Sequence, residues 1–311
     1  MYNSTKPYRR QILDLIEKTW ETPYVHVTKG IYPVIIRKYS CHEIDHTDGI
    51  GTKGIYHWEH RTFRNAVLDA LAMNLNDLAL ARAVPYKLQN HIFIPEDDKP
   101  AIIEIAEALT DECIKRKIAI TGGETSIHNN LNGLEISLTV SGFIKSRRRN
   151  RFEIGDYLIG IKSNGLHSNG FTKVRELFHK EFREEFVEPT RIYFDEIDSL
   201  NERFHLNGMM HITGGAFTKL KDLLVEADLE LRRNYMPEPQ QIFKDLYNKG
   251  ISDEEMYKIF NCGIGFILSV PKKETDKIMD KLKDSYIIGD VVPGKRRIII
   301  ESAFSDKILE F

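Results

Sequence analysis

The chain has 311 residues, of which 41% are hydrophobic and 29% charged, and its formal net charge is −2. This balance allows a buried core and gives no electrostatic reason to expect binding to nucleic acid or to an anionic membrane. The three cysteines, Cys41, Cys113 and Cys262, are far apart, which fits a reducing compartment and no zinc-type pair. Without a membrane-length apolar run or a signal core, we expect a soluble, cytoplasmic protein.

The first half alternates strand-like and helix-like segments. Residues 63–83 are rich in Ala and Leu, and residues 99–116 carry apolar side chains at helical spacing, so both are predicted helices. We expect strands at 32–38, 42–47, 86–94, 118–120 and 134–144. The polar, basic run at 145–150 is the predicted domain boundary.

The second half restarts with a predicted strand at 157–161, a polar loop and a helix from Phe171. Further helices are expected at 217–226, 239–248, 253–260 and 272–283, and further strands at 265–270, 286–291 and 297–301. Because both halves mix helices and strands, the sequence predicts two α+β domains, at 1–148 and 149–311.

The segment TDGIGTK (residues 47–53) follows a predicted strand and holds a carboxylate, two glycines, a hydroxyl and an ammonium. Glycines let the backbone approach a phosphate, and exposed N–H groups can bind it. Asp48 has the chemistry to hold magnesium, and Lys53 to hold a phosphate. On this segment alone a turn between strands is the better interpretation, because Asp-Gly is a strong hairpin signal.

Polar residues interrupt the apolar helix predicted at 63–83. Asp69 and Asn76 are seven residues apart and share a face, with Asp77 beside them. A carboxylate on an apolar helix is costly unless a cation or hydrogen-bond donors satisfy it. Both a ligand site and a capping or solvent-facing carboxylate explain this pattern.

The segment GGET (residues 122–125) follows the short strand predicted at 118–120 and places Glu124 behind two glycines. A metal–phosphate site and a plain Gly-Gly turn explain it equally well.

Glycine-rich loops also precede helices in the second half. SNGLHSNG (residues 163–170) is a candidate phosphate cradle at a helix N-terminus, although Ser168 or Asn169 also fits a helix cap. We favour a functional role for His167 because it lies in a polar loop. Arg191 taken alone fits a surface cation. Together, the acidic and glycine-rich corners suit a nucleotide with magnesium and a second phosphorylated ligand.

In order and spacing, these motifs resemble the aminoimidazole ribonucleotide synthetase family, also called phosphoribosylformylglycinamidine cyclo-ligase. The resemblance runs from about Thr47 to the end of the chain. The matching segments are TDGIGTK (47–53), LDALAMNLNDL (68–78), GGET (122–125), SNGLHSNGF (163–171), EPTRIY (188–193), HITGGAF (211–217) and EEMYKIFNCGIGF (254–266).

The resemblance implies a two-domain synthetase fold. The N-terminal, ATP-binding and dimerisation domains (1–148) of two subunits would share a β-barrel, and the C-terminal domain (149–311) would be an α/β sandwich. Apolar strands at 34–36 and 134–143 favour such closure, because one small domain would leave them as sheet edges. The implied reaction is a ligase step of purine biosynthesis: formylglycinamidine ribonucleotide and ATP give aminoimidazole ribonucleotide, ADP and phosphate.

Carried over position by position, the resemblance gives catalytic roles to Asp48, Lys53, Asp77 and His167. Mg²⁺ would bind Asp48, Asp77 and Glu124. The ATP site would comprise Asp48, Gly49, Gly51, Thr52, Lys53, Asp69, Asn76, Asp77, Gly122, Gly123 and Glu124. The ribonucleotide would contact His167, Ser168, Asn169, Gly170, Thr190, Arg191, Thr213, Gly214 and Gly215.

The chain departs from the family pattern at several positions. The family's glycine- and lysine-containing segment has no counterpart before Thr47, a family glycine is Arg82, and a family aspartate is Asn90. Two alternatives stay open: another ATP-dependent enzyme of the same superfamily, or a dimeric ligand-binding pseudoenzyme. A pseudoenzyme has little need for the acidic residues and the histidine that are all retained.

Overall fold

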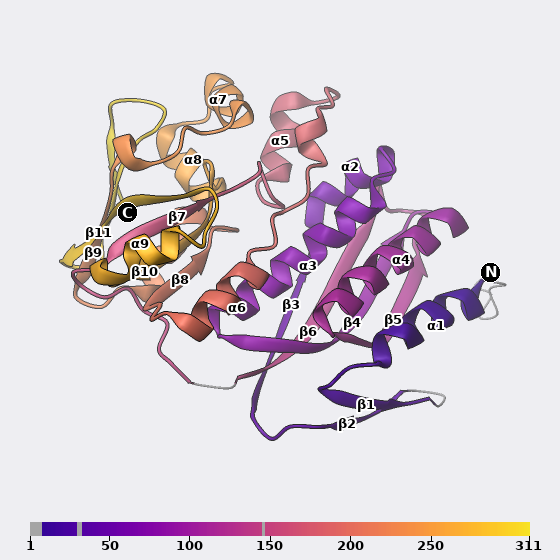
Figure 1. Cartoon of the computed structure of the whole chain (residues 1–311). Coiled ribbons are helices and arrows are strands. Elements are labelled where there is room, and N and C mark those ends of the chain that lie inside the picture. Colours follow the sequence, from indigo (N-terminus) through magenta and orange to yellow (C-terminus); the bar gives the residue numbers. More distant parts are fainter. Residues whose placement is uncertain (1–7, 30–32, 145–146) are drawn as a thin grey trace. The chain divides into compact units, whose positions relative to one another are not determined.

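The computed structural model describes residues 8–29, 33–144 and 147–311 (Figure 1). The contacts separate into two compact units. The first contains the described residues up to 78 and from 83 to 144, and the second contains 79–82 and 147–311. Each unit has its own sheet and helices, so the expected two-part α+β organisation is confirmed. No helix within the described ranges is long and apolar enough to cross a membrane.

The first unit has a four-stranded sheet in the order β3-β6-β4-β5, in which β4 and β5 are parallel and the other pairs antiparallel. A separate ribbon pairs β1 with β2. Figure 1 shows α3 and α4 along one face of the larger sheet. The elements are α1 (Arg9–Glu17), β1 (Val25–Thr28), β2 (Val34–Arg37), β3 (His42–Gly49), α2 (Gly54–Glu59), α3 (Phe63–Leu80), β4 (Ala83–Ile94), α4 (Lys99–Arg116), β5 (Ala119–Ile127) and β6 (Glu135–Ile144).

Helix α3 is the core of the first unit. Its Ala and Leu residues favour a helix, and because they occupy all sides of it, the helix is buried rather than amphipathic. Val67, Leu71 and Leu75 are completely buried, and so are the polar residues Asp69 and Asn76. Those polar side chains need partners within the protein.

Two expectations for the sheet were wrong. The strand predicted at 118–120 continues as β5 to Ile127, so GGET lies within a strand and not in a turn. A Cβ on Gly123 would come within 2.6 Å of the Asn90 side chain in the paired strand β4, so glycine permits the pairing there. Strand β6 lies between β3 and β4, so it is not the exposed edge that its apolar sequence suggested.

One side of the β1–β2 ribbon packs against the rest of the first unit. Ile35 packs with Tyr86 and Phe143 in a small core cluster. Val34 and Ile36, which alternate with Ile35, are 60% and 59% exposed. The predicted strand at 32–38 begins at Tyr32, which lies outside the described residues.

The second unit has a seven-stranded sheet in the order β13-β12-β9-β11-β7-β10-β8, in which β9 and β12 are parallel and the other pairs antiparallel. Its elements are β7 (Tyr157–Lys162), α5 (Phe171–Phe178), α6 (Phe194–Arg203), β8 (Gly208–His211), β9 (Ala227–Leu231), α7 (Gln241–Asn248), α8 (Asp253–Ile259), β10 (Ile264–Val270), α9 (Thr275–Met279), β11 (Ser285–Pro293), β12 (Ile298–Glu301) and β13 (Ile308–Glu310).

Two predicted helices of the second unit differ in the structure. The segment at 217–226 forms a 3₁₀ helix, Ala216–Leu223, which follows Gly215 at φ 80° and begins with Ala216 at φ 42°. The helix expected at 272–283 is a 3₁₀ turn followed by α9, which ends at Met279.

Arg82 explains one departure from the family pattern. Its φ is 53°, in the left-handed region that favours glycine. Its guanidinium is buried and donates to the carbonyl oxygen of Leu206 at 2.8 Å. Burial lowers the pKa of Arg82 to about 10, with a smaller contribution from Arg148. The side chain therefore offsets the strained backbone with contacts that glycine lacks.

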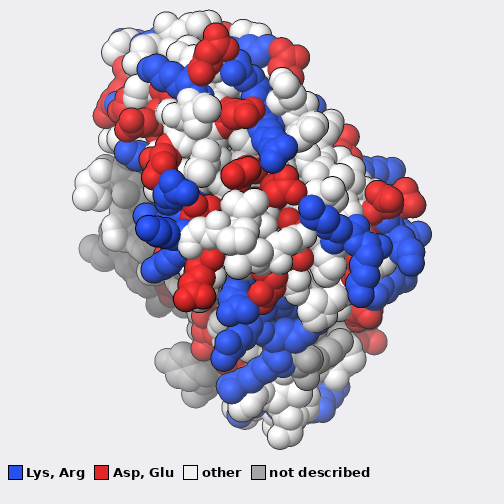
Figure 2. Space-filling model, turned by 90° about the vertical axis from the view of Figure 1, so that its left-hand side faces the viewer, with Lys and Arg blue, Asp and Glu red and all other residues white. Residues whose placement is uncertain are grey.

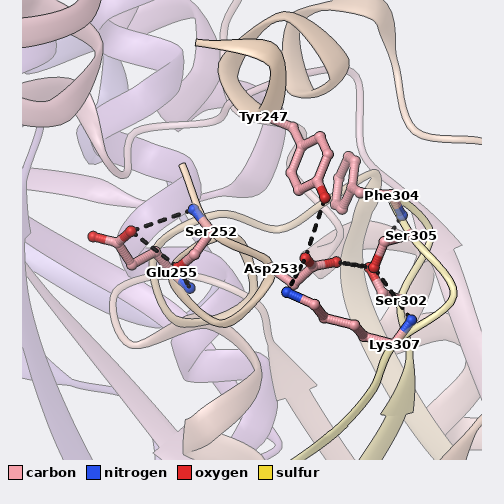
Figure 3. A network of polar contacts seen from close by, with 8 residues as sticks. All are labelled: Tyr247, Ser252, Asp253, Glu255, Ser302, Phe304, Ser305 and Lys307. Atoms are coloured by element: carbon pink, nitrogen blue, oxygen red, sulfur yellow. Dashed lines mark hydrogen bonds and ion pairs between the residues drawn. The ribbon is translucent and has the colours of Figure 1, made fainter. Parts of the chain in front are cut away.

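Asp253, at the start of α8, ties the C-terminal segment to the second unit (Figure 3). Its carboxylate is buried and accepts from the hydroxyls of Ser302 at 2.5 Å, Ser305 at 2.7 Å and Tyr247 at 3.2 Å. Burial alone would raise the pKa of Asp253, but these hydroxyls and Lys307 bring it below its ordinary value. The ionised carboxylate is thus the centre of the contacts.

We expect Asp253→Asn to lower the free energy of unfolding by about 2 kcal/mol, because buried hydroxyls lose a charged acceptor. Urea denaturation measures the change. The control is Glu254→Gln on the same helix, where an exposed pair with Lys258 contributes about 0.5 kcal/mol or less. Equal stabilities of the two variants would contradict the role of Asp253.

Candidate functional site

The TDGIGTK segment ends β3 and turns into a 3₁₀ helix at Gly51–Lys53. Its N–H groups point at carboxylates of the chain itself. The N–H of Gly49 donates to Asp48 Oδ1 at 2.8 Å, and the N–H of Ile50 donates to Glu135 Oε1 at 3.2 Å. The loop is therefore not the open phosphate cradle that its glycines suggested.

Glu135 was not predicted to be a site residue, because in the sequence it is a single acidic residue in a predicted apolar strand. It begins β6, and its carboxylate also accepts from the N–H of Gly51. Burial raises the pKa of Glu135, and the negative charge of Asp48 raises it further. Two carboxylates, Asp48 and Glu135, thus lie at the same turn.

Asp48 and Asp77 both lie near His46, two residues before Asp48 on β3. His46 Nε2 is 3.3 Å from Asp77 Oδ2, and His46 Nδ1 is 3.1 Å from Asn74 Oδ1. The contact with Asp77 raises the pKa of His46, and the charge of Asp48 acts in the same direction. Neither His46 nor Asn74 was selected from the sequence, since nothing local marks which strand α3 faces.

Lys53 and Asp69 lie elsewhere than expected. Both are completely buried, and Lys53 Nζ is 2.9 Å from the Asp69 carboxylate. His57 Nε2 contacts the same carboxylate at 2.8 Å, and His57 Nδ1 is 2.7 Å from Thr62 Oγ1. In this structure Lys53 neutralises a buried carboxylate instead of facing a phosphate. The neighbouring Asn76 is also completely buried.

Glu124 projects from the sheet on the other face from Asp48. Glu124 pairs with His91, which contacts Ser126 on the same face, whereas Gly123 lies against Asn90 in the next row. Because side chains alternate between the two faces of a sheet along each strand, Glu124 lies on the face opposite the side chains that face α3. Accordingly, within the described ranges no three His, Cys, Asp or Glu side chains form a group suited to a metal ion.

In the second unit the structure brings three predicted segments together. Ser168 Oγ is 2.8 Å from Thr190 Oγ1, and Asn169 Nδ2 donates to Thr213 Oγ1 at 2.8 Å. The loop before α5, the EPTRIY segment and the HITGG loop therefore meet. Gly170, at φ 75°, ends the first of these loops.

His167 and Arg191 are less accessible than expected. His167 is 2% exposed, has φ 62°, and lies beside Tyr193 and His211, with ring centroids 6.0 and 6.3 Å away. Arg191 donates to the carbonyl oxygen of Lys162 and pairs with Glu196 at 3.1 Å. Both side chains are thus held by the protein's own groups. His211 was not selected as a site residue, although the HITGG motif contains it.

Comparison with known families matches both units. Residues 40–144 match the family described as "AIR synthase related protein, N-terminal domain", and residues 153–301 match its C-terminal domain. The phosphoribosylformylglycinamidine cyclo-ligase of Saccharolobus solfataricus is 33% identical over 298 residues, covering 92% of this chain and 90% of the relative. That of Thermococcus kodakarensis is 34% identical, covering 80% of each.

Solved structures share the fold at low sequence identity. The hydrogenase maturation protein HypE in complex with ATP superposes with a TM-score of 0.73 at 14% identity, over 99% of this chain and 95% of that one. Thiamine-monophosphate kinase from Stenotrophomonas maltophilia has a TM-score of 0.67 at 15% identity, over 95% and 96%. At these identities the likeness extends to the fold.

The buried contact of His57 generates a pH-dependent prediction. Burial lowers the pKa of His57, although Asp69 acts in the opposite direction. In the unfolded chain, His57 has a pKa of about 6.5 and binds a proton below that pH, whereas in the folded state the ring stays neutral to a lower pH. The stability contributed by neutral His57 is thus present above about pH 6.5 and is lost as the pH falls toward the lower folded pKa.

His57→Gln keeps an N–H donor for Asp69 but does not titrate. We expect the free energy of unfolding to fall more steeply for the parent than for this variant between about pH 6.5 and 5. Urea denaturation at each pH measures it, with His26→Gln, at an exposed position of β1, as control. Parallel pH profiles for the parent and His57→Gln would contradict the assignment.

Proposed function

This chain belongs to the AIR synthase family, and we propose that it closes the imidazole ring of aminoimidazole ribonucleotide in purine biosynthesis. The substrates are formylglycinamidine ribonucleotide and ATP, and the other products are ADP and phosphate. One observation carries the proposal: relatives named phosphoribosylformylglycinamidine cyclo-ligase align at about one-third identity over nearly the whole of both chains. Both units of the fold are therefore accounted for by one activity.

The reaction requires a poor leaving group to be activated. Transfer of the γ-phosphoryl group of ATP to the formyl oxygen gives an iminophosphate, and the amidine nitrogen then closes the ring and expels phosphate. Little of this chemistry needs covalent help from a protein. Positioning of the two substrates and neutralisation of phosphate charge account for most of the catalysis.

We assign the phosphate end of ATP to the first unit. Mg²⁺ in nucleotide sites is held by one or two carboxylates together with the phosphates of the substrate, and Asp48 and Asp77 beside His46 fit that requirement. When bound, Mg²⁺ neutralises phosphate charge. The backbone at Gly49, Gly51, Thr52, Gly122 and Gly123 is proposed as a further nucleotide contact. Glu124 faces the other side of the sheet, so it is not proposed to bind the magnesium held by Asp48 and Asp77.

We assign the ribonucleotide to the second unit, where the Ser168–Thr190 and Asn169–Thr213 contacts join three loops. Gly214 and Gly215 are exposed and complete this proposed surface, because they leave the backbone accessible to a ligand. Gly170 is included for its backbone alone, since a Cβ there would come within 2.3 Å of the Phe260 ring. His167 and Arg191, which belong to these loops, are proposed to hold the loops in place through their contacts with Tyr193 and with the Lys162 carbonyl oxygen. Lys53, Asp69 and Asn76, which are buried, stabilise the first unit and are not proposed to contact ATP.

A cytoplasmic homodimer completes the proposal. The described cysteines are free, which suits a reducing compartment. Strands β3 and β5 are the edges of the described four-stranded sheet, and pairing across a two-fold axis into a shared barrel would cover them.

Asp77→Asn is expected to reduce turnover about 10²–10³-fold, the typical cost of one preorganised electrostatic contact. Formation of aminoimidazole ribonucleotide by purified protein, with ATP and MgCl₂, measures it. Asp111→Asn, at an exposed position of α4, is the matched control and should keep parental turnover. ATP turnover by the parent only with a different acceptor would favour another superfamily activity, and no turnover at all would favour a pseudoenzyme.

Light scattering should give twice the mass of one chain at micromolar concentration. The exposed apolar side of β2 is proposed to be covered in the dimer as well, so Ile36→Glu should shift the protein toward monomer. Ile308→Glu, at an exposed position of the second unit, should remain dimeric. A monomeric parent would contradict the shared barrel.

A further inference from the structure

Asn74 is held in one orientation by three contacts. It is completely buried on α3, and its Nδ2 donates to the carbonyl oxygens of Ala70 at 2.9 Å and Asp48 at 3.1 Å. Carbonyl oxygens only accept hydrogen bonds, so the amide NH₂ must face them. The amide oxygen of Asn74 is therefore the atom that faces His46.

This orientation fixes the hydrogen on His46. Because Asn74 Oδ1 is an acceptor 3.1 Å from His46 Nδ1, the nitrogen Nδ1 must carry a hydrogen. The other nitrogen, Nε2, faces Asp77 Oδ2 at 3.3 Å. Both ring nitrogens thus face acceptors, and Nε2 must carry a hydrogen as well for the contact with Asp77 to be a hydrogen bond. The imidazole ring is held at both ends, and one of its ends meets the carboxylate proposed to bind the metal.

The chain of contacts links the two proposed magnesium ligands. It runs from the carbonyl of Asp48 through the Asn74 amide and the His46 ring to Asp77. Asp48 is on strand β3 and Asp77 is on helix α3, so these contacts join two carboxylates that belong to different elements. Partial burial of His46 and Asp77, whose side chains are 29% and 20% exposed, limits competition from water.

We propose that Asn74 and His46 are positioning residues, which hold the Asp77 carboxylate in place for the magnesium–nucleotide complex. The inference rests on the proposed ATP site. Neither side chain reaches the reacting atoms in this role. Misplacement of a ligand by about an ångström is costly to such a site, so the groups that position the ligand also affect metal binding.

The test compares side chains that keep or lose the contact with Asp77. The Nε2 of glutamine can take the place of His46 Nε2 as a donor, whereas alanine offers none. Mn²⁺ serves as the probe, and its affinity is measured by electron paramagnetic resonance in the presence of a non-hydrolysable ATP analogue. His42→Ala, at an exposed position of the same strand, is the matched control.

His46→Ala should weaken Mn²⁺ binding about tenfold, the order expected for loss of one charge-assisted hydrogen bond. His46→Gln should stay within about threefold of the parent. In the steady state, the KM for Mg·ATP should rise in His46→Ala while the KM for the ribonucleotide is unchanged. His42→Ala should match the parent.

Parental or tighter Mn²⁺ binding by His46→Ala would overturn the positioning role. Equal losses in His46→Ala and His46→Gln would also overturn it, because the donor would then be irrelevant. If His46→Ala does not fold, His46→Asn decides: it can reach Asn74 but is too short for Asp77, and should bind Mn²⁺ as weakly as expected for alanine. A parent that forms no aminoimidazole ribonucleotide refutes the proposed reaction, while the Mn²⁺ affinities still decide this inference.

Discussion

The first unit depends on a negative charge inside an apolar helix. Asp69 lies on α3 among completely buried residues, and Lys53 and His57 reach its carboxylate, which makes a buried charge tolerable there. Removing one partner from such a buried pair typically costs about 3–5 kcal/mol. Since Lys53 ends the TDGIGTK segment, this requirement also docks that segment on α3.

Local patterns in the sequence were sufficient to predict the elements in which residue type and apolar spacing favour the same secondary structure. The helices at α3 and α4 and the strand β4 have consistent spacing, and each was expected within a few residues of its observed bounds. Local patterns failed at GGET, where two glycines suggested a turn. The strand continues there, and Gly123 is a glycine because the Asn90 side chain of the paired strand occupies the space that a Cβ would need. Such a contact between strands has no local signature.

In the candidate site, too, local patterns identified some residues correctly and failed for others. Asp48 and Asp77 were selected from local composition, and the structure brings both near His46. Composition alone suggested Lys53 as a phosphate ligand, because a lysine in a glycine-rich loop has that chemistry. Its actual partner lies sixteen residues further on, and only the packing of α3 brings the two together. Contacts of that kind require the tertiary fold, as do the side-chain bonds that join the loops of the second unit.

Glu135 gives the loop at Gly49–Gly51 an unusual property. Its carboxylate already accepts from the N–H groups of Ile50 and Gly51. A phosphate that reaches these groups competes with Glu135, whose charge stays beside the turn because the side chain is attached to the chain. The approaching anion therefore meets a like charge. Because salt screens such repulsion, rising ionic strength should weaken phosphate binding at this turn less than at a turn without a carboxylate.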